Sequence, residues 1–257
     1  MTRIRLDLRY DGTGYLGWQK QPKAPMTIQN ALEEALFSLI GIKPSTVGSG
    51  RTDAGAHARQ QVVHFDFDGP TNKYPWVNAI NSKLPQQIQL FEAYEAPLEF
   101  HSLLSAEKKE YVYFIHNAEL PPVFRRDFCW WQRRPLDVAW LNTASKFFVG
   151  EHDFKSFQNT GTLVPSTIRT VFLANWTQIS PQTLKFRIIG NGFLKQMVRN
   201  IVGTLVELSF QKREPIEILK VLQAQDRGAA GQTAPAQGLF LNRVSYPQKL
   251  DNKCRKL

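Results

Sequence analysis

The sequence predicts an α+β fold in which two similar mixed halves form a largely antiparallel central sheet flanked by helices. Several segments alternate apolar and polar residues, which is the pattern of half-buried strands. Others place apolar residues three or four positions apart, which is the pattern of amphipathic helices. Both patterns recur in a similar order in residues 1–106 and 107–257. We therefore expect two domains, an N-terminal α+β half and a C-terminal α+β half.

The N-terminal half begins with a strand over residues 3–10, where apolar residues alternate with charged ones before the turn at Asp11-Gly12. A helix is expected over residues 27–40, because Thr27 is a suitable N-cap and Gly41 a suitable residue to end it. The remaining expected elements are a strand over 61–67, a short helix near 75–83 and a strand near 87–95.

The C-terminal half shows the same kinds of element. Its expected elements are strands over 111–115, 166–178, 183–190 and 239–246, and helices over 136–149, 193–210 and 215–224. Residues 117–135 contain two adjacent prolines and form an excursion between elements. The polar tail, Lys249 to Leu257, is expected to fray.

Composition indicates a globular protein rather than a disordered one, with 42% hydrophobic residues in a chain of 257. Cys129 and Cys254 lie far apart, which argues against a disulfide framework and a thiolate zinc site. No signal-type apolar core follows the N-terminus, and no apolar run approaches the length of a membrane span. We expect a soluble cytoplasmic protein.

The net charge of +10 is distributed unevenly. Residues 1–106 carry ten basic and ten acidic side chains, whereas residues 107–257 carry 22 and 12. Such an excess favours a polyanionic partner, because basic side chains that neutralise phosphates release counterions. Arg125-Arg126 and Arg133-Arg134 flank aromatic residues, a combination that suits RNA contact but also occurs at the edge of a core.

One glycine-rich loop, residues 48–57, places Arg51 two positions before Asp53. Glycines let the backbone approach a ligand closely, so we expect this loop to present Asp53 to a bulky partner. A dinucleotide-binding loop would need glycine at position 53, and the Gly-Lys-Ser/Thr of a phosphate-binding loop is absent. The loop therefore offers a carboxylate with a guanidinium close by.

Seven segments in register along the chain resemble the tRNA pseudouridine synthase A family. They are Tyr10 to Gln19 with Thr27-Ile28-Gln29, Gly50 to His57, Lys109 to Tyr113, Gly150 to Phe154, Arg169-Thr170-Val171, Phe193 to Gly203, and Ala230 to Ala236 with Gly238-Leu239. Any one of them is weak alone, whereas Gly-Arg-Thr-Asp-x-Gly-x-His together with the rest is specific. The resemblance implies the pseudouridine synthase fold.

The resemblance also implies an activity and the residues that serve it. The expected reaction is isomerisation of uridine to pseudouridine in the anticodon stem-loop of tRNA, around tRNA positions 38 to 40, by a homodimer without a cofactor or metal. Asp53 matches the family's essential catalytic residue. Tyr111 matches the tyrosine that stacks on the flipped uracil, and Arg199 matches the basic residue paired with the aspartate. Arg51 is expected to fill the space left by the extruded base and to grip phosphate.

The chemistry leaves two routes open. A carboxylate can attack C1′, as in retaining glycosidases, or remove a sugar proton to give a glycal intermediate. The sequence departs from the family pattern at Leu103, where arginine is usual, and at Ala56, where valine is usual. The first change removes a side chain that would dock RNA or form a local salt bridge, and the second should cost only a little packing.

Two other functions are compatible with the sequence. One is a non-catalytic RNA-binding or RNA-folding protein on the same scaffold. The other is a metal-dependent hydrolase that uses His57 and the cluster Glu151-His152-Asp153, although no third ligand for His57 has suitable spacing. The family match instead places that cluster in a connection between a helix and a strand.

Overall fold

The structure is a computed structural model and describes residues 1–22 and 24–257. The chain divides into two compact units, residues 1–108 with 241–257, and residues 109–240. Strand β10 (Leu239–Ser245) begins in the second unit and ends in the first. That residues 1–106 and 107–257 are two separate domains stays a prediction.

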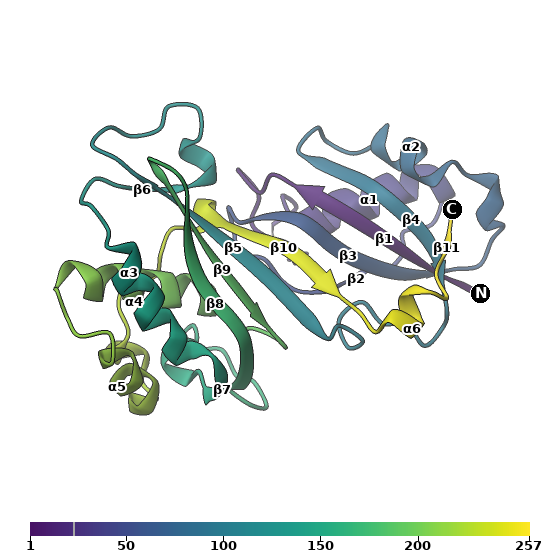
Figure 1. Ribbon diagram of the computed structural model, residues 1–257. Coiled ribbons are helices and arrows are strands. Elements are labelled where there is room, and N and C mark those ends of the chain that lie inside the picture. The colour runs from purple at the N-terminus through teal and green to yellow at the C-terminus, as the bar shows by residue number, and fades with distance from the viewer. Residues whose placement is uncertain (23) are drawn as a thin grey trace. The chain divides into compact units, whose positions relative to one another are not determined.

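The first unit consists of a sheet with two helices on one face (Figure 1). Its strands follow the order β11-β4-β1-β3-β10, with the short β2 beside β3, and the register of β1 with β3 and with β4 is antiparallel. In chain order its other elements are β1 (Thr2–Tyr10), α1 (Ile28–Ile40), β2 (Val47–Gly48), β3 (His57–Phe67), α2 (Trp76–Asn81), β4 (Ile88–Ala96), α6 (Gln248–Asp251) and β11 (Arg255–Lys256).

The expected ends of α1 are confirmed. The Thr27 hydroxyl accepts a hydrogen bond from the backbone N–H of Asn30, and Gly41 has a left-handed φ of 75°. Strand β3 begins at His57, four residues before the expected start. Leu6 and Leu8 of β1 and Leu32 and Leu36 of α1 are fully buried, as alternation and helical spacing predict. Phe37 of α1, which the expected apolar face does not include, is exposed.

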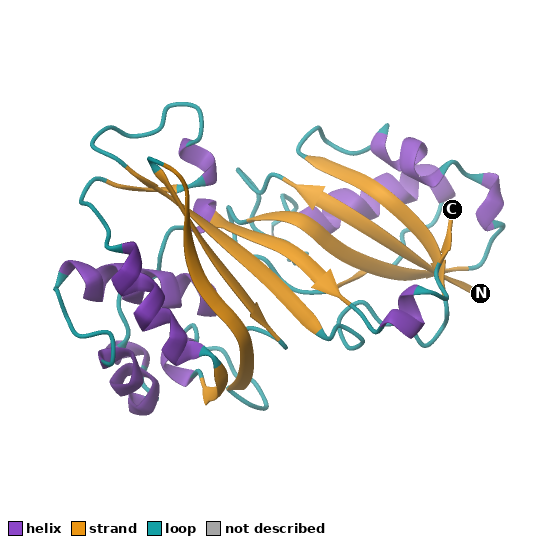
Figure 2. Ribbon diagram, in the orientation of Figure 1, coloured by secondary structure: helices purple, strands orange, loops and turns teal. Residues whose placement is uncertain are grey.

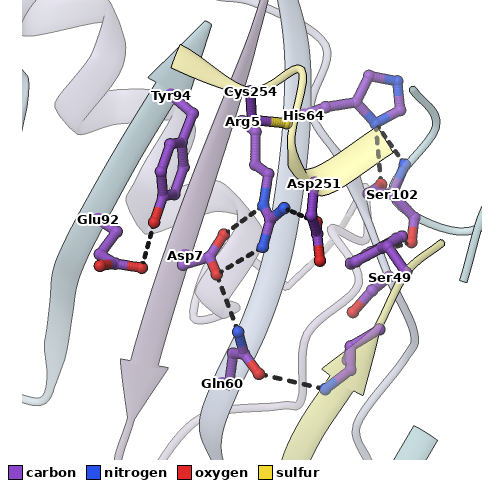
Figure 3. Close-up of polar contacts among 12 residues, drawn as sticks. Arg5, Asp7, Ser49, Gln60, His64, Glu92, Tyr94, Ser102, Asp251 and Cys254 are labelled. Carbon is purple, nitrogen blue, oxygen red and sulfur yellow. Dashed lines mark hydrogen bonds and ion pairs between the residues drawn. The ribbon is translucent and has the colours of Figure 1, made fainter. Parts of the chain in front are cut away.

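The prediction that the C-terminal tail frays is wrong, because residues 248–256 form α6 and β11. The guanidinium of buried Arg5 donates to Asp7 Oδ1 at 2.8 Å and to Asp251 Oδ1 at 2.6 Å (Figure 3). Burial works against its charge, but these two carboxylates raise the pKa of Arg5 above its ordinary value. The rings of Tyr94 and Tyr246 each lie 5.2 Å from the guanidinium carbon. The tail is thus held by contacts with the first strand.

The second unit consists of a sheet with strand order β5-β9-β8-β7, in which every one of these pairs is antiparallel. Helices α3 and α4 lie against one face of it (Figures 1 and 2). Its elements, β10 apart, are β5 (Lys108–Asn117), β6 (Trp130–Gln132), α3 (Val138–Ser145), β7 (Gly150–Asp153), β8 (Ile168–Ser180), β9 (Thr183–Gly190), α4 (Met197–Phe210) and α5 (Glu217–Ala224).

Three expectations for this unit need correction. The helix expected over 193–210 begins at Met197, because Gln196 has a left-handed φ of 62°. The excursion 117–135 contains β6, which pairs with β5 in parallel. Residues Glu151 to Asp153 do not form a connection; they belong to β7 and pair with Ile168 to Thr170 of β8.

The predicted α+β class, with a mostly antiparallel sheet and flanking helices, is confirmed. No helix in the described part of the chain combines the length and the apolar character that crossing a bilayer requires.

Candidate active site

The loop between β2 and β3 carries Asp53 and is fixed by backbone hydrogen bonds. The N–H of Ala56 donates to the carbonyl of Asp53 at 3.1 Å, which closes a turn whose third residue, Gly55, has a left-handed φ of 75°. The amide of Gln61 donates to the carbonyl of Gly50 at 2.7 Å. Asp53 itself is half-buried. The loop therefore holds this carboxylate at a defined position near the surface.

A second loop, residues 11–18, packs against the first. The N–H of Trp18 donates to the carbonyl of Thr52, and the N–H of Gly55 donates to the carbonyl of Tyr15, each at 3.1 Å. The hydroxyls of Tyr10 and Thr52 lie 2.8 Å apart. Asp53 thus lies between residues that the second loop anchors on both sides.

Three glycines, Gly12, Gly17 and Gly48, make room for protein rather than for a ligand. A Cβ on Gly12 would lie 2.0 Å from the carbonyl oxygen of Ala56, and one on Gly17 would lie 2.6 Å from that of Thr52. A Cβ on Gly48 would lie 2.7 Å from the indole of Trp18. The interpretation that the glycines of residues 48–57 give a partner access to Asp53 is therefore revised for Gly48, which makes room for the Trp18 indole. Gly12 and Gly17 let the two loops approach each other.

His57 joins the same two loops and is fully buried. Its Nδ1 accepts a hydrogen bond from the N–H of Gly12 at 3.0 Å and lies 3.1 Å from Asp11 Oδ1. The described residues contain no group of three or more His, Cys, Asp or Glu side chains placed to hold a metal ion. These contacts indicate a structural role for His57.

Arg51 lies in the same loop as Asp53 and is exposed. Within residues 1–22 and 24–257 no hydrogen bond or ion pair to its side chain is found. Its guanidinium is thus accessible to a partner in solution. Asp53 and Arg51 are the two predicted site residues that lie in the first unit.

Tyr111 and Arg199 lie in the second unit. Tyr111 is buried in β5, with its ring edge-to-face against that of Phe193 at a centroid distance of 5.1 Å. Arg199 lies in the first turn of α4 and is half-buried. Its Nε donates to the carbonyl of Ala234 at 2.7 Å, while the N–H of Ala234 donates to the carbonyl of Arg199 at 3.2 Å.

A buried amide in α4 fixes the segment that contacts Arg199. Asn200 Oδ1 accepts hydrogen bonds from the Thr233 hydroxyl at 2.7 Å and from Arg227 at 3.2 Å. Its Nδ2 donates to the carbonyl of Phe157 at 2.8 Å. A Cβ on Gly203 would lie 1.8 Å from the carbonyl oxygen of Gln232, so this segment contacts the helix backbone directly. Sequence reasoning missed this support, although both segments had been identified as motifs.

The basic excursion is exposed at several of its aromatic and charged side chains. Phe124 is 95% exposed and Trp131 39% exposed. Arg126 and Arg133 are exposed as well, and Arg133 forms an ion pair with Glu119. Leu103, the departure from the family pattern, is also exposed. An RNA contact at the excursion stays a prediction.

Comparisons with known proteins find the same family that the sequence motifs resemble. The sequence profile of a family described as tRNA pseudouridine synthase matches residues 8–103 and 144–247. The tRNA pseudouridine synthase A of Bdellovibrio bacteriovorus is 45% identical over 260 residues, which cover 100% of this chain and 99% of that protein. The protein of the same name from Maridesulfovibrio salexigens is 44% identical over 96% of this chain and 91% of its own length.

Among solved structures, similarity is found to one described as "Structure of H/ACA RNP bound to a substrate RNA containing 2'-deoxyuridine". It is 11% identical, with a TM-score of 0.40, over 93% of this chain and 47% of that chain. The chain thus spans about half the length of that protein.

Proposed function

The chain belongs to the tRNA pseudouridine synthase family, and we propose that it isomerises uridine to pseudouridine in the anticodon stem-loop of tRNA. The observation that carries this proposal is the 45% identity to a tRNA pseudouridine synthase A over 100% of the chain. We place the modified uridines around tRNA positions 38 to 40.

The reaction breaks the bond between N1 of uracil and C1′ of ribose and joins C5 to C1′. The proton on C5 is lost and N1 gains one, so the substrate and product have the same composition. The base must first leave the helical stack to expose C1′. The enzyme therefore has to hold a flipped nucleotide, cleave one bond and keep the free uracil bound while it turns.

We propose Asp53 as the group that acts at C1′, either as the nucleophile or as the base that removes a sugar proton. Its place in a doubly anchored loop supports this role, because either route depends on a fixed carboxylate position. Exposed Arg51 in the same loop would occupy the space left by the flipped base.

Tyr111 and Arg199 are proposed as substrate-binding residues. The aromatic ring of Tyr111 is fixed by Phe193, and a fixed ring loses little entropy when a base stacks on it. Arg199 is positioned by the hydrogen bond from its Nε to the carbonyl of Ala234, and a guanidinium can form charge-assisted hydrogen bonds with an anion such as the developing charge on uracil.

The proposal also includes a homodimer, a cytoplasmic location and an RNA contact at the exposed arginines of residues 117–135. The net charge of +10 supports a polyanionic substrate. A molar mass of one chain for the active protein, measured by light scattering during turnover, would contradict the dimer.

Chemical mapping of pseudouridine in tRNA tests the function. Undermodified tRNA is incubated with purified wild-type protein or with Asp53→Asn, without added metal or cofactor. We expect new pseudouridine in the anticodon stem-loop with the wild type and none with the variant. Binding of tRNA by the wild type without any new pseudouridine would refute the enzyme and support a non-catalytic RNA-binding protein.

A further inference from the structure

Lys109 and Arg169 lie on the same face of the second unit's sheet as Tyr111. In β5, Lys109 and Tyr111 are two residues apart and so point to one side. Lys109 is paired with Gly190 of β9, and Gly190 is paired with Val171 of β8. Arg169 precedes Val171 by two residues, so it shares that face as well.

Phe193 and the glycines beside it lie between Arg169 and Tyr111. The Arg169 side chain passes beside Gly192, where a Cβ would lie 3.6 Å from its Nε. The next residue is Phe193, whose ring contacts Tyr111 and lies 3.1 Å from where a Cβ of Gly190 would be. Lys109, Arg169 and Tyr111 therefore surround one turn, residues 190–193.

This pair of cations has no acidic partner within the residues that the structure describes. No hydrogen bond or ion pair to the Lys109 amine is found there, and Arg169 donates only to the carbonyls of Ser166 and Ile168, both through Nη1. The intervening acid, Glu110, points to the opposite face and binds Arg187 at 2.8 Å. Burial, together with the charge of Arg169, lowers the pKa of Lys109 to about 8.

Two neighbouring cations without a carboxylate repel each other, and binding an anion between them relieves the repulsion. We propose that Lys109 and Arg169 form a subsite for one backbone phosphate of the RNA strand that carries the target uridine. Bound next to Tyr111, this phosphate would position the flipped nucleotide. The inference rests on the proposed function and adds two positioning residues to it.

The first test measures binding of an anticodon stem-loop RNA as a function of salt concentration. Lys109→Met and Arg169→Met should each raise Kd about tenfold at 0.1 M salt and reduce the slope of log Kd against log salt by about 0.7 to 0.9, the value for one phosphate contact. Lys220→Met removes an exposed charge paired with Glu217 and serves as the matched control. Lys109→Arg retains the charge and should restore the slope.

The second test identifies the phosphate. Stem-loops with a single neutral methylphosphonate linkage are scanned across the anticodon arm. One linkage near the target uridine should weaken binding by the wild type about tenfold and leave the Kd of Lys109→Met unchanged. If both variants keep the wild-type slope and the wild-type response to every linkage, the subsite does not exist.

Pseudouridine formation by the wild type is measured separately on the same stem-loop. Conversion by the wild type with unaltered slopes in the variants would overturn the subsite alone. If the salt slopes of the variants change but the wild type forms no pseudouridine, the proposed function is refuted and the phosphate contact stands. Arg169→Met keeps the subsite testable if Lys109→Met fails to fold.

Discussion

Replacement of Gly17 by alanine should strain the backbone and also displace the loop of Asp53. The same replacement at Gly14 should strain the backbone alone, so it serves as the matched control. Both glycines have left-handed φ values, 90° for Gly17 and 78° for Gly14. A Cβ on Gly14 would have no atom within 4 Å, whereas one on Gly17 would lie 2.6 Å from the carbonyl oxygen of Thr52 and 3.1 Å from the carbonyl carbon of Asp53. Only Gly17→Ala places a methyl group against the loop that carries Asp53.

The expected magnitudes follow from these distances. An alanine in the left-handed region costs about 1 kcal/mol, so Gly14→Ala should lose about that much unfolding free energy and keep its activity. Gly17→Ala has the same strain plus overpacking of about 1 to 3 kcal/mol. Relief of the clash at Thr52 requires a shift of about 0.8 Å, from 2.6 Å to the 3.4 Å at which ordinary contacts begin. A shift of that size beside a reacting carboxylate should lower kcat/KM by about 10- to 100-fold.

Urea unfolding and initial rates of pseudouridine formation measure the two effects. The reasoning is refuted if Gly17→Ala and Gly14→Ala have the same kcat/KM, because loop displacement would then have no catalytic consequence. Equal losses of unfolding free energy would likewise show that the contact with Thr52 contributes no strain.

Three further predictions concern single side chains. Lys109→Met should raise the unfolding free energy by on the order of 2 kcal/mol at pH 7, because burial lowers the pKa of Lys109 to about 8 and the charged form is disfavoured in the folded protein. That advantage should shrink between pH 8 and about 10.4, where the unfolded lysine titrates; a constant difference in urea unfolding over this range would contradict it. Burial lowers the pKa of His64 to about 4, so below pH 6.5 the unfolded chain binds a proton that the folded protein does not. The wild type should therefore lose about 2 kcal/mol of unfolding free energy by pH 5, and urea unfolding of His64→Gln should show no such loss. Asn200→Ala should lose about 2 to 4 kcal/mol of unfolding free energy, since Arg227 and Thr233 lose a buried acceptor. Calorimetry should show no such loss for the control Asn252→Ala, whose exposed side chain directly follows α6.

The parts of the fold that local sequence determines were predicted well. The N-cap at Thr27 and the left-handed Gly41 bound α1 because capping depends on residues within one turn of the helix. The C-terminal tail was mispredicted because its order depends on Arg5, which is distant in sequence and binds Asp251. The start of α4 was mispredicted because Gln196 adopts a conformation that glutamine rarely takes.

In the candidate site, too, local sequence predicted some features, whereas others depend on residues distant in sequence. The Gly-Arg-Thr-Asp motif identified the loop of Asp53, but the role of a glycine in that loop depends on which distant atoms it faces, such as the indole of Trp18 opposite Gly48. Lys109 and Arg169 could not be grouped from the sequence, because their common face follows from the register of β5, β9 and β8. The sequence offered one signal, the spacing of two residues between Lys109 and Tyr111, which places both side chains on one face of a strand.

The most direct test of the central claim measures catalysis and binding in the same Asp53→Asn protein. Single-turnover conversion of an anticodon stem-loop and its Kd are determined for the variant and for the wild type. We predict that the rate falls by more than about 10³-fold while Kd changes by less than about threefold, because the variant keeps the loop and loses only the carboxylate. A variant that converts uridine at a rate near that of the wild type would contradict the assignment of the chemistry to Asp53.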